Sequence, residues 1–160
     1  MATRRDIEER VLAGLPGWVN AISQLNRLVA ERLGVTASDL DGLHVLNEQG
    51  PSTAAELARR VGLTPGSVSR MIDRLDAAGC IRRTGDPRDR RRVLIEPTQD
   101  GLNRIAAYYD GLTARAHEDL SIFRSQELSI LLHFIERSRR SAVDELERLR
   151  RSPATDQENE

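Results

Sequence analysis

The chain has 160 residues, enough for one ordinary domain with helical additions, and its formal net charge of −1 excludes polyanion binding driven by total charge alone. One cysteine excludes an internal disulfide and fits a reducing compartment, and no apolar run approaches the ~20 residues of a membrane-spanning helix. We therefore expect a cytoplasmic protein without a signal peptide or a membrane segment. Because aromatic residues make up only 3%, we expect a core of aliphatic side chains.

The N-terminal 34 residues predict two helical segments. The first is a short helix in TRRDIEERVLAG, which we expect to break or kink at Pro16-Gly17. Apolar residues then recur at helical spacing from Trp18 to Val29, and Gly34 is the expected stop. This region is predicted to contribute helices to a larger helical body.

Three more helices are predicted from their capping residues. A helix capped near Thr36 ends at Gly50-Pro51, and the next begins where Thr53 and Glu56 stand at capping-box spacing. A third follows Thr64, which is the expected N-cap before a proline at the first helical position. Its apolar stripe, predicted to face the core, is Val68, Met71, Ile72 and Leu75, and Gly79 ends it.

A β-hairpin with a charged tip is predicted next. CIRRTG and RRVLIE are two short segments typical of strands. Four arginines and two aspartates lie in the stretch from Gly85 to Arg92, at the tip. Taken alone, such a charge run is consistent with an ordinary solvated loop.

Two long helices complete the chain, at about 98–123 and 125–150, followed by a polar tail at 152–160 that we expect to be disordered. The second helix carries an apolar stripe whose spacing of seven favours packing along another helix. The stripe consists of Leu128, Leu132, Ile135, Ala142, Leu146 and Leu149.

The order helix, short turn, helix, hairpin is typical of a winged helix-turn-helix. Residues 52–99 hold ten arginines and six acidic residues, so basic charge is concentrated there. The helix after Thr64 begins with small polar residues and carries Arg70 and Arg74 outward, which suits the DNA major groove. The arginine-rich hairpin tip would lie against the DNA backbone or in a minor groove. A solvated face of a helical bundle is the alternative for the helix alone.

The segment from about Val35 to Gly101 resembles the MarR (multiple antibiotic resistance regulator) family of bacterial transcription regulators. LTPGSVSRMIDRLDAAGCIRR follows the family's pattern for the DNA-reading helix and first strand, and DPRDRRRVLIEPTQDG matches its wing and closing motif. Cys80 departs from the pattern, because relatives usually carry Leu, Tyr or Trp there.

The resemblance implies a homodimer whose N- and C-terminal helices interleave, with one winged lobe per protomer on each half of a pseudo-palindromic operator in double-stranded DNA. Carried onto this chain, it implies an Asp73–Arg91 ion pair that orients the wing. The implied DNA-contacting residues are Thr64, Pro65, Gly66, Ser67, Ser69, Arg70, Arg74, Arg88, Arg90 and Arg91.

Some residues raise the question of a sensor. Cys80 is predicted to be a core residue, with a redox switch as the alternative. His44, His117 and His133 lack the spacing of a zinc site, so we expect neither metal nor cofactor. In the family, the helices here enclose a cavity for a small molecule, which would suit an aromatic or phenolic effector. The residues on them are Trp18, His44, Tyr108, Tyr109 and Arg115, and ordinary packing of scarce aromatics is the alternative.

These observations predict a mainly α protein with a small β-hairpin wing: a winged helix-turn-helix lobe plus a helical dimerisation body. We expect dimerisation helices at 1–34 and 98–151 and the DNA-binding lobe at 35–97. The predicted function is an effector-responsive transcriptional regulator, most often a repressor in this family. The alternative is a winged-helix module that docks on other proteins. An enzyme finds no support, because the sequence has neither a Gly-rich phosphate loop nor a recognisable nucleophile–base pair.

Overall fold

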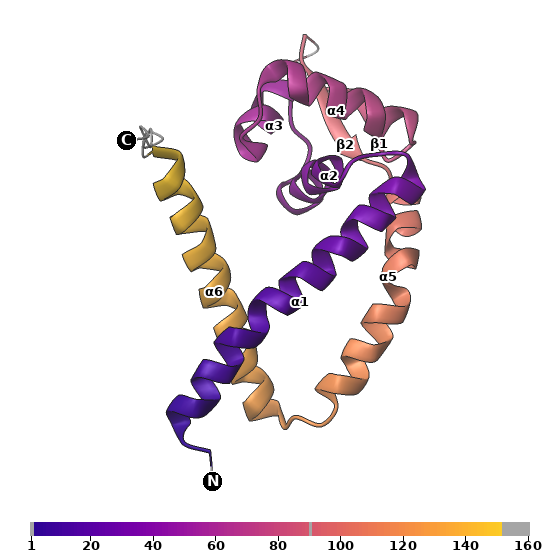
Figure 1. The fold of residues 1–160 in the computed structure, drawn as a ribbon. Helices are drawn as coiled ribbons and strands as arrows, with labels where there is room; N and C mark the ends of the chain where they lie inside the picture. The colour runs from indigo at the N-terminus through magenta and orange to yellow at the C-terminus, as the bar shows by residue number, and fades with distance from the viewer. Residues whose placement is uncertain (1, 90, 152–160) are drawn as a thin grey trace, which may run out of the picture. The chain divides into compact units, whose positions relative to one another are not determined.

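A computed structural model of the protein describes residues 2–89 and 91–151. Within them the elements are α1 (Arg4–Leu33), α2 (Ala37–Gln49), α3 (Ala54–Val61), α4 (Pro65–Ala77), β1 (Ile81–Gly85), β2 (Val93–Pro97), α5 (Gln99–Leu120) and α6 (Ser125–Arg151) (Figure 1). The mainly helical architecture with one hairpin is therefore confirmed. The chain divides into two compact units, with the boundary after Tyr109. The predicted tail at 152–160 lies outside the described residues.

The helix α1 corrects the first prediction. It runs unbroken for 30 residues with Pro16 inside it, so of the break or kink expected at Pro16-Gly17 the break does not occur. A capping box at Thr3 and Asp6 stabilises its start, and Gly34 in the left-handed conformation, φ 72°, ends it. Proline removes one backbone hydrogen bond from a helix interior, and the intact turns on both sides keep the rest.

The predicted caps of the next three helices are confirmed. Thr36 and Thr53 each accept a hydrogen bond from the backbone three residues later, and Asp39 and Glu56 return the bond to complete two capping boxes. Thr64 caps α4, with Pro65 in the first turn. Short turns connect α2, α3 and α4, and each of the three helices packs against the other two, the arrangement of a helix-turn-helix.

The first unit contains one hydrophobic core. Buried side chains from α1 to β2 form it, and the predicted α4 stripe of Val68, Met71, Ile72 and Leu75 is buried within it. Cys80 is fully buried there, as predicted, and burial raises the pKa of its thiol. A low-reactivity thiol in the core is the result.

The hairpin pairs antiparallel, with Ile81 opposite Pro97 and Gly85 opposite Val93. Ser52 forms an additional bridge to Ile95, so the chain ahead of α3 is joined to the hairpin. These hydrogen bonds fix β2 beside the helix-turn-helix and make the hairpin the wing of that lobe.

The second unit comprises the end of α5 and the helix α6. None of the described residues of α6 is buried in the single chain, and Leu132, Ile135, Leu146 and Leu149 on its stripe are 48–57% exposed. No helix in the described part of the chain is both long enough and apolar enough to cross a membrane.

Candidate nucleic-acid interface and adjoining pocket

The exposed face of α4 presents small polar residues first and an arginine next. Thr64 donates its hydroxyl hydrogen to Ser67 across 2.9 Å, so two of the predicted contact residues share one network at the helix start. Pro65, Gly66, Ser69 and Arg70 are exposed. Exposed polar groups at the start of a helix suit the edges of base pairs.

Arg74, by contrast, has a partner inside the lobe. Its Nε donates to Asp39 Oδ2 and its Nη2 to Asp39 Oδ1, each at 2.7 Å. Asp39 is fully buried and also accepts from the backbone N–H of Thr36 at 2.7 Å. Arg74 therefore neutralises a buried carboxylate, a role that the sequence did not predict.

The pKa of Asp39 reflects this environment. Burial by itself would raise the pKa of the carboxyl, but the hydrogen bonds from Arg74 and from Thr36 outweigh it and lower the pKa. In turn, the hydrogen bond to Asp39 raises the pKa of the Arg74 guanidinium. The pair is charged at neutral pH.

The predicted Asp73–Arg91 pair does not form in this structure. Asp73 Oδ1 instead accepts from Nη2 of Arg83 on β1 at 2.6 Å, and Arg83 also lies 3.7 Å from Asp76. Arg83 stands ten residues from Asp73 in the hairpin's first strand, which lies against α4, whereas Arg91 lies in the tip. Arg83 on β1 thus joins the base of the wing to the side of α4.

A second ion pair ties the wing to α3. Arg92 Nη2 donates to Glu56 Oε1 at 2.7 Å, and Arg92 Nε lies 3.8 Å from Asp86. The backbone N–H of Thr53 lowers the pKa of Glu56, and Arg92 lowers it further. The base of the wing is therefore held by charge on both α3 and α4.

Two of the three predicted wing arginines are described, and both have exposed side chains. Arg88 and Arg91 use their backbone N–H groups, which donate to Asp86 and Asp89. Arg90 lies outside the described residues. On α3, Arg59 is exposed and was not singled out from the sequence, because nothing in its spacing distinguishes it from Arg60, which donates to Gly50 O.

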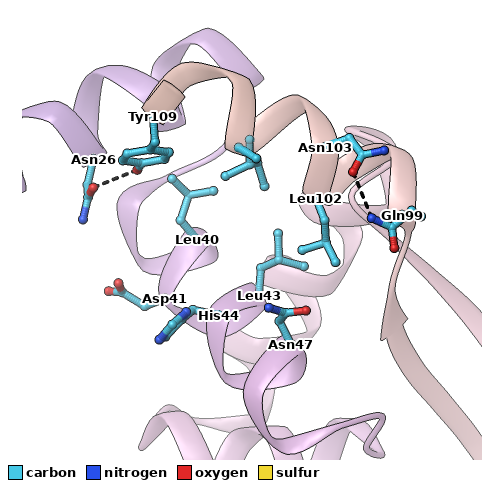
Figure 2. A pocket seen from close by; sticks show the side chains of 12 residues that line it. Asn26, Leu40, Asp41, Leu43, His44, Asn47, Gln99, Leu102, Asn103 and Tyr109 are labelled. Carbon is cyan, nitrogen blue, oxygen red and sulfur yellow. Dashed lines mark hydrogen bonds between the residues drawn. The ribbon is translucent and has the colours of Figure 1, made fainter. Parts of the chain in front are cut away.

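A pocket of about 570 Å³ opens between α2 and α5 within the first unit. Figure 2 shows Leu40, Leu43 and Leu102 lining its middle and Tyr109 bonded to Asn26 at one end. The Tyr109 hydroxyl donates to Asn26 Oδ1 at 2.8 Å, and burial raises its pKa. The complete lining is Asn26, Leu40, Asp41, Leu43, His44, Asn47, Gln99, Leu102, Asn103, Ile105, Ala106 and Tyr109.

Only part of the predicted effector set lines this pocket. His44 and Tyr109 are present, whereas Trp18, Tyr108 and Arg115 are absent from its lining. Trp18 is 66% exposed and Tyr108 is 43% exposed in the single chain. A linear pattern gives no means of choosing which face of a helix lines a pocket, so the role of these residues in effector binding stays a prediction. Within the described residues, no three His, Cys, Asp or Glu side chains gather as metal ligands would.

Comparisons with known proteins bear on the whole arrangement. The model of the MarR family matches residues 33–92. The HTH-type transcriptional regulator YcgE of Bacillus subtilis (strain 168) is 35% identical over 125 residues, which cover 78% of this chain and 81% of YcgE. The HTH-type transcriptional repressor MdtR of the same strain is 29% identical over 122 residues, or 76% and 79% of the two chains. The crystal structure of apo MarR from E. coli shares the fold, with a TM-score of 0.54 at 23% identity over 79% of this chain and 95% of that one.

Proposed function

The chain belongs to the MarR family of transcriptional regulators, and from that premise we propose that it represses transcription as a homodimer on a pseudo-palindromic operator. A small aromatic or phenolic effector releases it. The relative MdtR is named a repressor, which supports the sign of the regulation. The observation that carries the DNA-binding part is the exposed polar face of α4, flanked by wing arginines that lack acidic side-chain partners among the described residues.

In this proposal the α4 face reads bases and the wing holds phosphates. Ser67, Ser69 and Arg70 enter the major groove, with Thr64, Pro65 and Gly66 at the helix start near the backbone. Arg88, Arg90 and Arg91 contact the phosphates or a minor groove, and Arg59 on α3 adds a further phosphate contact. Arg74, which was also expected to contact DNA, is given no base contact in this proposal, because its Nε and Nη2 donate to Asp39.

The two terminal regions supply the dimer. Residues 1–34 and 98–151 act as dimerisation helices and residues 35–97 as the DNA-binding lobe. The exposed apolar side chains of α6 support this division, because a partner helix would remove them from water. Two α4 helices then lie in successive major grooves, roughly 34 Å apart.

The pocket between α2 and α5 is the proposed effector site. Its volume of about 570 Å³ falls within the range of small-molecule sites, and leucines line it beside amide and phenol groups. A neutral or weakly acidic aromatic molecule would bury its ring against the leucines and bond its polar group to Tyr109, Asn26 or Asn103. An effector acts only through its different affinities for DNA-competent and DNA-incompetent dimers.

The test begins with fragments of the source genome, from which the purified protein selects a duplex. Fluorescence anisotropy then measures the dissociation constant for that duplex and for a scrambled one at several salt concentrations. We expect tighter binding to the selected duplex and a steep decline with salt. Equal, negligible binding to both would contradict the proposal and favour a protein-docking role for the winged lobe.

A further inference from the structure

One face of the helix α2 is buried in the core of the lobe, and another lines the pocket. At 3.6 residues per turn, Asp39, Gly42 and Leu46 share one stripe, and all three are buried. Leu40, His44 and Asn47 share another stripe, which lines the pocket (Figure 2). The same short helix is therefore both a wall of the pocket and part of the support of α4.

The buried stripe of α2 meets α4 at two points. A Cβ atom added at Gly42 would lie 2.5 Å from Met71 Sδ, so the two helices are in close contact there. Three residues away, Asp39 receives the two-pronged ion pair of Arg74. A guanidinium that bonds both oxygens of one carboxylate fixes orientation as well as distance.

The carboxylate end of this pair is itself held rigidly. Asp39 belongs to the first turn of α2 and accepts from the backbone N–H of Thr36, so it moves with the start of the helix. Leu40 and Asp41, the next two residues, line the pocket. If a molecule in the pocket displaces this turn, Asp39 moves with it and Arg74 follows, because close-packed interiors deform little.

We propose that Asp39 and Arg74 are positioning residues for DNA binding, which hold α4 on α2 and transmit a change in the pocket wall to the exposed face of α4. This inference rests on the proposed DNA-binding function. Neither residue touches DNA in it. Arg70, one turn before Arg74 on α4, is the group that the pair brings into place.

The test uses a side chain in place of an effector. Ala106 on α5 lines the pocket, so Ala106→Phe fills part of it, whereas Ala107→Phe at the next position, which does not line the pocket, is the matched control. Each is placed in the wild-type chain and in an Asp39→Asn, Arg74→Gln background, whose uncharged amides are similar in size to the ion pair. Anisotropy gives the dissociation constant for the selected duplex in every case.

We expect Ala106→Phe to change the dissociation constant by about 5-fold or more in the wild-type chain, the lower end of typical coupling between sites. In the uncharged background the change should fall below about 2-fold, the scatter of independent substitutions. Ala107→Phe does not fill the pocket, so any change that it causes in the dissociation constant should be the same factor in both backgrounds. Circular dichroism establishes folding, and Arg74→Lys, which keeps the charge without the fork, serves as the background if the double variant is unfolded.

Equal fold-changes in both backgrounds would overturn the proposal, since the pair would then support the lobe without carrying the signal. An unchanged dissociation constant for Ala106→Phe in the wild-type chain would also overturn it, because the pocket wall would not communicate with α4. Failure of the wild-type chain to prefer any duplex is a separate result that contradicts the proposed function itself.

Discussion

The carboxylate of Asp73 on α4 accepts a hydrogen bond from Arg83 on β1 at 2.6 Å, and this bond helps divide the arginines of the lobe into two groups. Arg74, Arg82, Arg83 and Arg92 are paired with carboxylates. A second group has exposed side chains whose guanidinium groups have no hydrogen-bond or ion-pair partner among the described residues: Arg59, Arg70, Arg88 and Arg91. The first group builds the lobe, and the second is available to DNA.

The wing arginines should contribute salt-dependent affinity. We expect Arg88→Ala and Arg91→Ala each to weaken operator binding, because each variant leaves one DNA phosphate per lobe without its arginine. The slope of log affinity against log salt should fall by about 0.9 for every phosphate left unneutralised in this way. Anisotropy titrations across several salt concentrations measure both quantities.

A charge-neutral change on the same hairpin is the control. Arg82 donates to Glu96 at 2.6 Å, so Arg82→Gln with Glu96→Gln removes an ion pair and leaves the net charge unchanged. Its salt slope should equal that of the wild type. If the Arg88 and Arg91 variants also kept the wild-type slope, the described wing arginines would not bind phosphates.

Arg70 should determine sequence preference. We expect Arg70→Ala to reduce the difference in binding free energy between the selected and scrambled duplexes by roughly 1–3 kcal/mol, the value of one good base interaction. Competition titrations with both duplexes measure it. Arg59→Ala on α3 provides the comparison. An arginine that contacts only a phosphate contributes equally to binding of the selected and of the scrambled duplex, so this variant should weaken both alike. If Arg70→Ala weakened binding to both duplexes equally, Arg70 would contact a phosphate instead. The preference for the selected duplex would then come from Ser67, Ser69 or DNA shape.

The sequence predicted the local features of this fold and missed the distant ones, for a physical reason. The caps at Thr36, Thr53 and Thr64 depend on residues three positions away, so a linear pattern contains the whole interaction. The Asp39–Arg74 pair joins residues 35 positions apart, and nothing local selects one arginine among ten.

The same division between local and distant features applies to the candidate site. The identities of the wing and of α4 follow from the order of elements and from the family motif. Which aspartate meets which arginine depends on how β1 lies against α4, and that is how Arg83 came to replace Arg91 as the partner of Asp73. The pocket likewise depends on which faces of α1, α2 and α5 meet, so the sequence could not choose which of the candidate effector residues line it.

Removal of Arg74 should destabilise the lobe. Breaking a fully buried ion pair by deleting one partner costs about 3–5 kcal/mol, and because Arg74 is 40% exposed we expect roughly 2–3 kcal/mol for Arg74→Ala. Urea unfolding followed by circular dichroism measures the decrease. Arg70→Ala, at an exposed site four residues earlier, is the control and should change the free energy of unfolding by less than about 0.5 kcal/mol.

The same pair should make stability depend on acid. The pKa of Asp39 is lower in the fold than in the unfolded chain, where an aspartate has a pKa of about 3.9. Its contribution is therefore present above about pH 4 and disappears as the pH falls through the folded value. The Asp39→Asn variant should show a shallower fall in unfolding free energy below about pH 4 than the wild type. Parallel curves for the two proteins would contradict a charged Asp39.

Cys80 should be inert in the native protein. It is fully buried, and burial raises the pKa of its thiol, so both access and the thiolate fraction are reduced. We expect a chromogenic disulfide reagent at pH 8 to react at least roughly 100-fold more slowly than with the urea-unfolded chain, because reaction requires local opening. Rapid native reaction, or loss of operator binding in mild peroxide that Cys80→Ser prevents, would restore the redox alternative.

The helix α6 should hold two copies of the chain together. Its 27 residues extend roughly 40 Å at 1.5 Å per residue, and the apolar stripe along it is uncovered in the single chain. Burial of one leucine contributes about 1.5–3 kcal/mol, so Leu132→Glu with Leu146→Glu should shift the protein from dimer toward monomer or aggregate. Arg140→Glu, on the polar side of the helix, is the control.

Truncation before Ser125 should likewise abolish two-site operator binding even if the winged lobe stays folded. Sedimentation velocity at micromolar concentration decides the matter: a folded, monodisperse monomer of the intact chain would exclude both the dimer and the palindromic operator that it requires.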